Sequence, residues 1–503
     1  MSKLLNQKLG KMVNFKEAKR QSPVAILLIL YRVMQMILRQ TLPILVVLIL
    51  NPKASKIDFI GIGIMAIGII SAISSVMSYF KFFYYVDDTH FHIRKGWLVK
   101  SNISIPIERI QTIDFYQNPI HKIFNVVQLD VDTAGSASKE IHIHALKKND
   151  ANLLRNYLYS KKEELLPEEA LNAVEHTEEE QILHRLGVGD LIKIGLVQNH
   201  LRTAGIIVAF GFTLYGELSE IFTKATDRFV EESFGVIERG GIYLTLTLLM
   251  LLLLAAIVGS VIVFFLQNYD LKLTSSGKGY RLVKGLLNQK QTSISLSKIQ
   301  MLRWSSNYLQ RKLNLVNLSI YQASSIIVNV KRAIYVPGLS PAGITNILSY
   351  VFEQINPKVF QIYRIHPLII LRRMLIMVVI PLLVIIMSNL DQMLRGVLIS
   401  LVWILFSAFW SYQYYKRYKI QIHEAGILIE NGVLTIKGVL MEWKNVQSIA
   451  LKQTPIQKRR ALTNMVLYTA AGAVQIPFVR MDEAKKLRDF ILYHTEHSKK
   501  EWM

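Results

Sequence analysis

Two kinds of hydrophobic pattern alternate along the chain. Long uninterrupted apolar runs come in three pairs, and a segment with strand-like alternation follows each pair. The paired runs cover 24–50 with 57–80, 201–222 with 241–266, and 367–387 with 394–415. Each run is close to the roughly 20 residues that a helix needs to cross a bilayer. The pattern predicts six transmembrane helices in three hairpins, and the first run, with Arg32 and Arg39 inside it, is too long for a cleaved signal peptide.

The segments after the hairpins are typical of β-structure. HFHIRKGWLV, GYRLVKGLLN and GILIENGVLT predict β-hairpins that turn at Lys-Gly or Asn-Gly. VVQLDVDTAG, VNLSIYQAS and NMVLYTAAG alternate apolar and polar residues, as half-buried strands do. An amphipathic helix then closes each segment, starting near Asp150, at Ser340-Pro341 and at Asp482. Each segment therefore predicts a small antiparallel β-barrel or sandwich with a C-terminal helix.

The three β-segments are copies of one another. A glycine and a glutamine stand 15 residues apart in each copy, and the register continues without gaps over about 40 residues. These repeat positions are Gly96 with Gln111, Gly285 with Gln300, and Gly432 with Gln447. The period of the repeat, 189 and then 147 residues, is that of a whole module with its membrane hairpin.

The fold class that follows is membrane α+β, with six transmembrane helices in three hairpins and a cytoplasmic β-module after each. The predicted order is a basic N-terminus (1–23), entry helix and first hairpin (24–80), first module (81–160), acidic linker (161–188), entry helix and second hairpin (189–267), second module (268–356), entry helix and third hairpin (357–415), and third module (416–497). The acidic linker is expected to be a solvated helix and tether.

Charge gives the orientation. Residues 1–23 hold six basic side chains and one acidic, whereas the turn after the third run has a net charge of −3. The positive-inside rule therefore predicts a multi-pass cell-membrane protein whose termini and modules are cytoplasmic. The net charge of +23 on an apolar chain favours a membrane surface over nucleic acid as partner. The absence of cysteine excludes disulfides and thiolate chemistry.

The repeated unit resembles a known family. The hairpin, the glycine turn, the Ile-Gln pair and QRKLNLVNLSIYQAS are similar to the bacterial pleckstrin-homology-like, or membrane-flanked, domain. Three copies in one chain resemble proteins of the YdbT type. The third copy departs from the others where Ala461-Leu462-Thr463 replaces the Asn-apolar pair of Asn125 and Asn314. The resemblance implies a pleckstrin-homology-like fold, membrane association and, for some relatives, tolerance of membrane-active bacteriocins. It implies no reaction.

Basic residues are the candidates for binding. The three modules carry net charges of +4, +9 and +7, concentrated in the second and third copies in LQRK and QKRR. A tethered module presents such residues to anionic headgroups, with about 1 kcal/mol for each nearby Lys or Arg. The predicted lipid- or partner-binding residues are Lys122, Arg311, Lys312, Lys458, Arg459 and Arg460. A plain solvated loop is the alternative. A second membrane protein with a pleckstrin-homology-like domain is a further candidate partner, and the oligomeric state stays open.

Catalytic and metal chemistry is not expected. His90 with His92 and His142 with His144 form strand pairs that could in principle bind zinc, but neither pair recurs in the other copies. We interpret them as solvated strand histidines, and the paired aspartates as turn and outward strand positions. No nucleophile elbow, P-loop or zinc-protease motif is present. We expect no enzyme activity, no cofactor and no metal site.

Three functions remain in order of preference. The first is a non-enzymatic membrane scaffold that binds anionic lipid or a membrane partner and supports envelope integrity. The second is a component of a transport or export system, and the third is a lipid-acting enzyme. Arg32 and Arg39 share one helical face, so they either reach the headgroups from an interfacial entry helix or line an intramembrane path.

Overall fold

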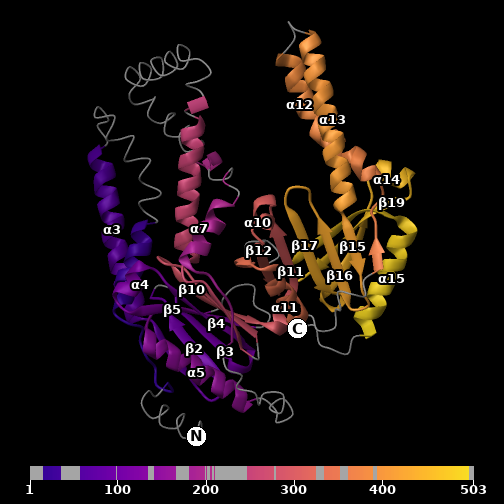
Figure 1. Ribbon diagram of the computed structural model, residues 1–503. Helices are drawn as coiled ribbons and strands as arrows, with labels where there is room; N and C mark the ends of the chain where they lie inside the picture. Colours follow the sequence, from indigo (N-terminus) through magenta and orange to yellow (C-terminus); the bar gives the residue numbers. More distant parts are fainter. Residues whose placement is uncertain are drawn as a thin grey trace. The chain divides into compact units, whose positions relative to one another are not determined.

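The computed structural model describes residues 15–35, 57–97, 99–133, 141–165, 181–198, 249–276, 279–323, 333–351, 361–388 and 393–497, with a few isolated positions between 200 and 247. The chain divides into two compact units, Met1–Ser293 and Ile294–Met503 (Figure 1). Each unit is described by itself.

The first unit contains the whole first module. Its elements are helix Val24–Gln35, α3 (Ile57–Phe80), β1 (Phe83–Val86), β2 (His90–Lys95), β3 (Ser101–Pro106), η1 (Ile107–Arg109), β4 (Ile110–Gln117), α4 (Pro119–Ile123), β5 (Val126–Thr133), β6 (Ile141–Lys147) and α5 (Lys148–Leu165). All strands are antiparallel, in two sheets, β1-β2-β3 and β6-β5-β4. Phe91 and Leu129, one from each sheet, are completely buried in the same core as Leu154 of α5. The alternating burial along β5 confirms the predicted strand.

The first unit also holds the start of the second module. Its elements are β7 (Gln181–Arg185), α7 (Val188–Leu196), helix Leu249–Asn268, β8 (Lys272–Ser276), β9 (Gly279–Lys284) and β10 (Gln289–Ser295). Strand β7 is a correction, because it lies in the predicted linker 161–188 and pairs with β8. The acidic composition hid a five-residue strand that is exposed along most of its length and so lacks strand alternation.

The second unit continues the second module and contains the third. Its elements are η2 (Leu296–Lys298), β11 (Ile299–Ser306), α10 (Tyr308–Lys312), β12 (Val316–Gln322), β13 (Ile334–Leu339), α11 (Pro341–Val351), β14 (Gln361–Tyr363), α12 (Leu368–Ser388), α13 (Met393–Arg417), β15 (Lys419–Ile422), β16 (Gly426–Asn431), β17 (Ile436–Glu442), η4 (Trp443–Asn445), β18 (Val446–Lys452), α14 (Pro455–Arg459), β19 (Leu462–Thr469), β20 (Gly472–Arg480) and α15 (Met481–His497). Trp443, Leu467 and Ile491 lie at the centre of its core. The Ser340 hydroxyl accepts from the Gly343 amide at 3.0 Å, which confirms the predicted N-cap of α11.

Neighbouring modules share sheets. The strand order is β6-β5-β4-β10-β9-β8-β7 in one seven-stranded sheet and β13-β12-β11-β17-β16-β15-β14 in the other. The second half of one module therefore continues into the first half of the next. The prediction of three self-contained barrels is corrected in this respect, because each inner edge strand finds its hydrogen-bonding partner in the adjacent copy.

Apolar helices extend from the modules. Among the described residues, two helices are long and apolar enough to cross a membrane, Leu249–Asn268 and Leu394–Arg417, and two shorter apolar stretches are Val24–Gln35 and Gly68–Phe80. Much of the predicted first and second hairpins, including 36–56 and 210–245, lies outside the described residues. The third predicted pair is a helical hairpin, since α12 packs along α13 and the Trp403 indole donates to the Met377 carbonyl at 3.0 Å.

Candidate functional site

The six predicted cations lie on or next to three equivalent one-turn helices, α4, α10 and α14. Asn118, Asn307 and Thr454 cap these helices by accepting from the backbone amide three residues on. A residue in the left-handed region ends each turn: Asn125 at φ 50°, Asn314 at 52° and Ala461 at 49°. The third copy thus keeps the backbone of the other two despite its alanine, and β19 begins directly after it.

These short helices lie where the apolar helices join the modules. Ile120 of α4 packs in one cluster with Tyr79 of α3 and Leu28 of the entry helix. Figure 1 shows α14 at the end of the second unit's sheets from which α12 and α13 extend. If the apolar helices cross a membrane, the predicted cations are at the membrane end of their modules.

The side chains of Lys122 and Arg311 form hydrogen bonds within the chain. The Lys122 ammonium donates to the Leu286 carbonyl, and the Arg311 guanidinium donates to the Leu434 carbonyl at 3.0 Å. Leu286 and Leu434 follow the repeat glycines of the next module by one and two residues. Lys122 and Arg311 therefore connect consecutive modules. Lys312 contacts its own short helix instead, with its ammonium 5.0 Å from the centre of the Tyr308 ring.

The third copy leaves its cations in solvent. Lys458, Arg459 and Arg460 are all exposed, and none of their side chains has a hydrogen bond or ion pair to another described residue. Lys122 and Arg311 each contact a carbonyl of the next module, and no described residue supplies the corresponding carbonyl to Lys458. Three adjacent positive charges remain at one exposed turn.

Large apolar side chains are exposed beside these cations. Ile123 of α4 is 76% exposed and Ile456 of α14 is 67% exposed. The glycine turns at the same end add Val99, which is 82% exposed, and the exposed side chain of Leu434. Exposed apolar residues interleaved with Lys and Arg are typical of surfaces that rest on a bilayer. The sequence analysis did not predict these exposed residues. The signal was the place of the isoleucines beside basic residues, since Ile123 ends α4 and Ile456 is the second residue of α14.

The repeat glycines are turn positions, as predicted. Gly96, Gly285 and Gly432 have φ of 94°, 108° and 120°. A Cβ at any of them would collide with a carbonyl oxygen three residues further on, so only glycine fits. Gln300 is 2% exposed whereas Gln447 is exposed, and the side chain of Gln111 lies outside the described residues. The glutamines are therefore equivalent in sequence but not in environment.

The junctions between modules have one register. In the first junction β4 pairs with β10, and Phe115 lies opposite Gln291. In the second β11 pairs with β17, and Trp304 lies opposite Gly438. Both pairs join the fourth residue after a repeat glutamine to the sixth residue after the next repeat glycine. The same strand positions thus meet in the same way twice.

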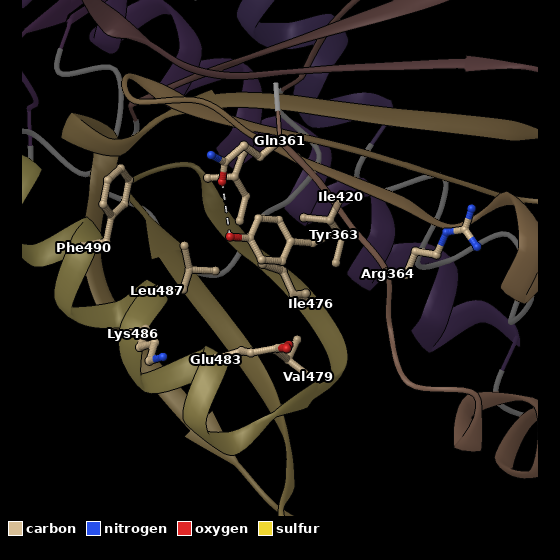
Figure 2. A pocket seen from close by; sticks show the side chains of 11 residues that line it. Gln361, Tyr363, Arg364, Ile420, Ile476, Val479, Glu483, Lys486, Leu487 and Phe490 are labelled. Carbon is tan, nitrogen blue, oxygen red and sulfur yellow. Dashed lines mark hydrogen bonds between the residues drawn. The ribbon is translucent and has the colours of Figure 1, made fainter. Parts of the chain in front are cut away.

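A groove of about 280 Å³ lies in the third module between β14, β15, β20 and α15 (Figure 2). Its floor is apolar and includes Ile420, Ile476 and Leu487, while Arg364 and Lys486 stand at its rim. Glu483 lines the groove as well, so its charged side chains carry both signs. None of these residues was predicted as a site, because the groove is formed by segments more than 100 residues apart.

One histidine of each predicted pair lies beside a carboxylate. His92 Nε2 lies 2.6 Å from Asp87, and His142 Nδ1 lies 2.9 Å from Asp130. Burial alone would raise the pKa of Asp87, but hydrogen bonds from His92 and two backbone amides hold it at about 2. His144 corrects the prediction of solvated histidines, because burial lowers its pKa to about 4. Among the described residues no three His, Asp or Glu side chains gather as a metal site would require.

One of the two predicted membrane arginines can be placed. The Arg32 guanidinium lies 3.4 Å from the Gln128 side-chain oxygen of β5 and is exposed. This contact puts Arg32 at the surface of the first module rather than inside a bundle of helices. Arg39 lies outside the described residues.

Comparison with known proteins agrees with the repeat. The bacterial PH domain family matches the chain three times, at residues 33–162, 226–354 and 369–495. The chain belongs to this family. Each bacterial PH domain match covers one β-module with part of the hairpin before it. The inner strands that form the two junctions, β4 with β10 and β11 with β17, therefore belong to different bacterial PH domains.

Two relatives come from Bacillus subtilis (strain 168). The transmembrane protein YdbT is 25% identical over 318 residues, which cover 61% of this chain and 63% of YdbT. The transmembrane protein YdbS is 28% identical over 143 residues, which cover 28% of this chain and 89% of YdbS. The chain thus spans somewhat less than two thirds of YdbT, and its match to YdbS covers most of that shorter protein.

Proposed function

We propose that this protein is a non-enzymatic scaffold of the cell membrane, with six spans, cytoplasmic termini and three cytoplasmic bacterial PH domains that bind anionic lipid at their membrane ends. Two long apolar helices and the transmembrane character of the two relatives support the location. The protein's role is to hold these domains against the inner leaflet.

The observation that carries the proposal is the turn around α14. Lys458, Arg459 and Arg460 are exposed next to Ile456, whose side chain is also exposed. An apolar side chain gains free energy by entering the acyl boundary while its cationic neighbours stay among anionic headgroups. Screening limits such charge contacts to about 8–10 Å, so they require a module held at the membrane.

A fluorescence experiment on the full chain tests this contact. The chain has no cysteine, so Ile456→Cys gives a single site for an environment-sensitive fluorophore. In nanodiscs that contain phosphatidylglycerol we expect a blue-shifted emission that headgroup spin-labelled lipid quenches. Lys485→Cys, on the exposed face of α15, is the matched control and should show neither effect.

Removal of charge separates lipid recognition from simple proximity. Arg459→Ala with Arg460→Ala should weaken the quenching at position 456 in anionic nanodiscs and change it little in zwitterionic ones. Equal removal of charge at Lys485 and Lys486, both exposed on α15, should have no effect. Quenching at position 456 no stronger than at position 485 would refute the lipid contact.

We further propose that the scaffold supports envelope integrity against membrane-active bacteriocins, as the family resemblance implies. Loss of the gene should raise the sensitivity of the cell to such peptides, and the wild-type chain should restore tolerance. The variant Arg459→Ala with Arg460→Ala should restore it less well. Equal sensitivity with and without the gene would contradict this role.

A further inference from the structure

Among the described residues, two strand edges lack the partner that their repeat equivalents have. Strands β4 and β11 pair with β10 and β17 of the next module, and β18 is the third strand at that position. Strands β10 and β17 are likewise equivalent to β3. Among the described residues β18 pairs only with β19, and β3 pairs only with β2. The sheet β18-β19-β20 therefore has at β18 an edge that is equivalent to that of β4. The sheet β1-β2-β3 has at β3 an edge that is equivalent to that of β10.

The side chains beside β18 also differ from their equivalents at the first two junctions. Lys122 and Arg311 close the first and second junctions by donating to a carbonyl beside the next glycine turn. Lys458, at the same repeat position, is exposed. Gln300 is buried where β11 is paired, and its carbonyl accepts from Asn445 at 3.0 Å, whereas Gln447 of β18 is exposed. The edge of β18 therefore has the repeat residues of a junction but, among the described residues, no partner strand.

The register of a third junction follows from the first two. Because Ser305 pairs with Lys437 in the second junction, the equivalent pair is Lys452 with Ser101. Leu451 would then lie opposite Asn102, as Trp304 lies opposite Gly438. Pro106, which cannot donate a hydrogen bond, falls outside the stretch that is paired in the second junction. Nothing in the sequence of either edge opposes the pairing.

We propose that β18 of one copy of this protein pairs antiparallel with β3 of a second copy. The chain itself supplies both halves of the missing junction, so a second copy has complementary edges in the required register. Such a contact is heterologous and joins copies head to tail. In this contact the third module of one copy is followed by the first module of the next copy, as consecutive modules follow one another within the chain. The proposal does not rest on the proposed binding of lipid.

Cysteine cross-linking in native membranes tests the proposal. Two differently tagged full-length chains are co-expressed, one with Ser101→Cys and the other with Lys452→Cys. Directly opposite residues have Cβ atoms about 4.5–5.5 Å apart, which oxidation can bridge. We expect a disulfide-linked species that carries both tags. The pair Ser305→Cys with Lys437→Cys in a single chain is the matched positive control, because it occupies the same repeat positions in the second junction.

The register is tested with Ser448→Cys in place of Lys452→Cys. Position 448 is four residues away along β18, about 13 Å at 3.3 Å per residue, so the doubly tagged species should be lost. A chain with both Ser101→Cys and Lys452→Cys tests whether one copy closes on itself. A cross-link within single chains only, equal linkage through position 448, or no linkage at 101 and 452 while the control pair forms, would each overturn the proposal.

Discussion

Ala461 adopts a backbone conformation that alanine disfavours. Its φ of 49° matches the 50° and 52° of Asn125 and Asn314, and asparagine tolerates this left-handed region better than alanine does. The capping box of Thr454 and Gln457 and the pairing of β19 with β20 hold the turn in place. The third copy therefore keeps the family turn with some local strain.

Relief of this strain should stabilise the protein. We expect Ala461→Gly to raise the free energy of unfolding by about 0.5–1 kcal/mol, because glycine adopts positive φ without a steric cost. Asn125→Ala should lower it by a similar amount. Thermal unfolding in detergent measures both, and Ala425→Gly, at a turn without positive φ, is the control that should not stabilise. A destabilised Ala461→Gly variant would show that the turn is not strained.

His144 should make the first module sensitive to acid. Its folded pKa of about 4 lies below the ordinary 6.5 because burial disfavours the charged ring. Below pH 6.5 the unfolded chain binds a proton that the folded chain does not, so stability falls as the pH drops from 6.5 to 4. The loss is up to about 3 kcal/mol.

The variant His144→Asn should remove this part of the pH dependence. Unfolding by denaturant at pH 7, 5.5 and 4 measures the slope of stability against pH in both chains. The wild type should lose stability more steeply than the variant between pH 6.5 and 4. Parallel profiles would mean that His144 titrates normally in the folded protein.

At the scale of strands, the junctions depend on matched pairs of large and small residues. A Cβ at Gly438 would collide with the indole of Trp304, because β17 and β11 bring the two positions face to face. In the first junction the same positions hold Gln291 and Phe115, so a smaller ring tolerates a side chain opposite it. The second junction therefore combines a large ring with glycine, and the first combines a smaller ring with a longer side chain.

Replacing the residue pair of the second junction by that of the first tests whether the two positions are equivalent. Gly438→Gln alone should destabilise the second unit by about 1–3 kcal/mol, the usual cost of overpacking. Adding Trp304→Phe should recover most of that loss, because the double variant reproduces the pair of the first junction. Unfolding in detergent gives both values. A double variant as unstable as the single one would show that the two junctions are not equivalent.

At the scale of the whole molecule, orientation in the membrane follows from charge. Single cysteines at Ser136, Ser325 and Ser498 should resist an impermeant thiol reagent in intact cells, whereas one at Thr226 should react. All four positions lie outside the described residues, so this prediction rests on the sequence. Reaction at the first three with silence at Thr226 would reverse the orientation.

Shared sheets also change what can be cut from the chain. The second module contributes β10 to a sheet with β4 and β11 to a sheet with β17. A fragment of residues 268–355 would lose both neighbours and expose two strand edges, which favours aggregation. Experiments on binding therefore need the full chain.

The sequence by itself determined the apolar helices, the strands, the closing helices and the threefold register. These features are local, since helix and strand periodicities and turn glycines act over a few residues. It also located Lys122, Arg311 and Lys458 at one repeat position, but it could not tell a cation that connects two modules from one that faces solvent. Nor could it find strand β7 or the groove beside α15.

Only the tertiary structure decided how modules join. Backbone hydrogen bonds carry no side-chain identity, so the pattern along β4, β11 or β18 does not name the strand that pairs with it. The pairing of Phe115 with Gln291 joins residues 176 positions apart, and it covers the edge of β4, whereas the equivalent edge of β18 has no partner strand among the described residues. Gln300 and Gln447 are the same residue in the same repeat position, and their burial differs because, among the described residues, β11 pairs with a strand of the next module and β18 does not.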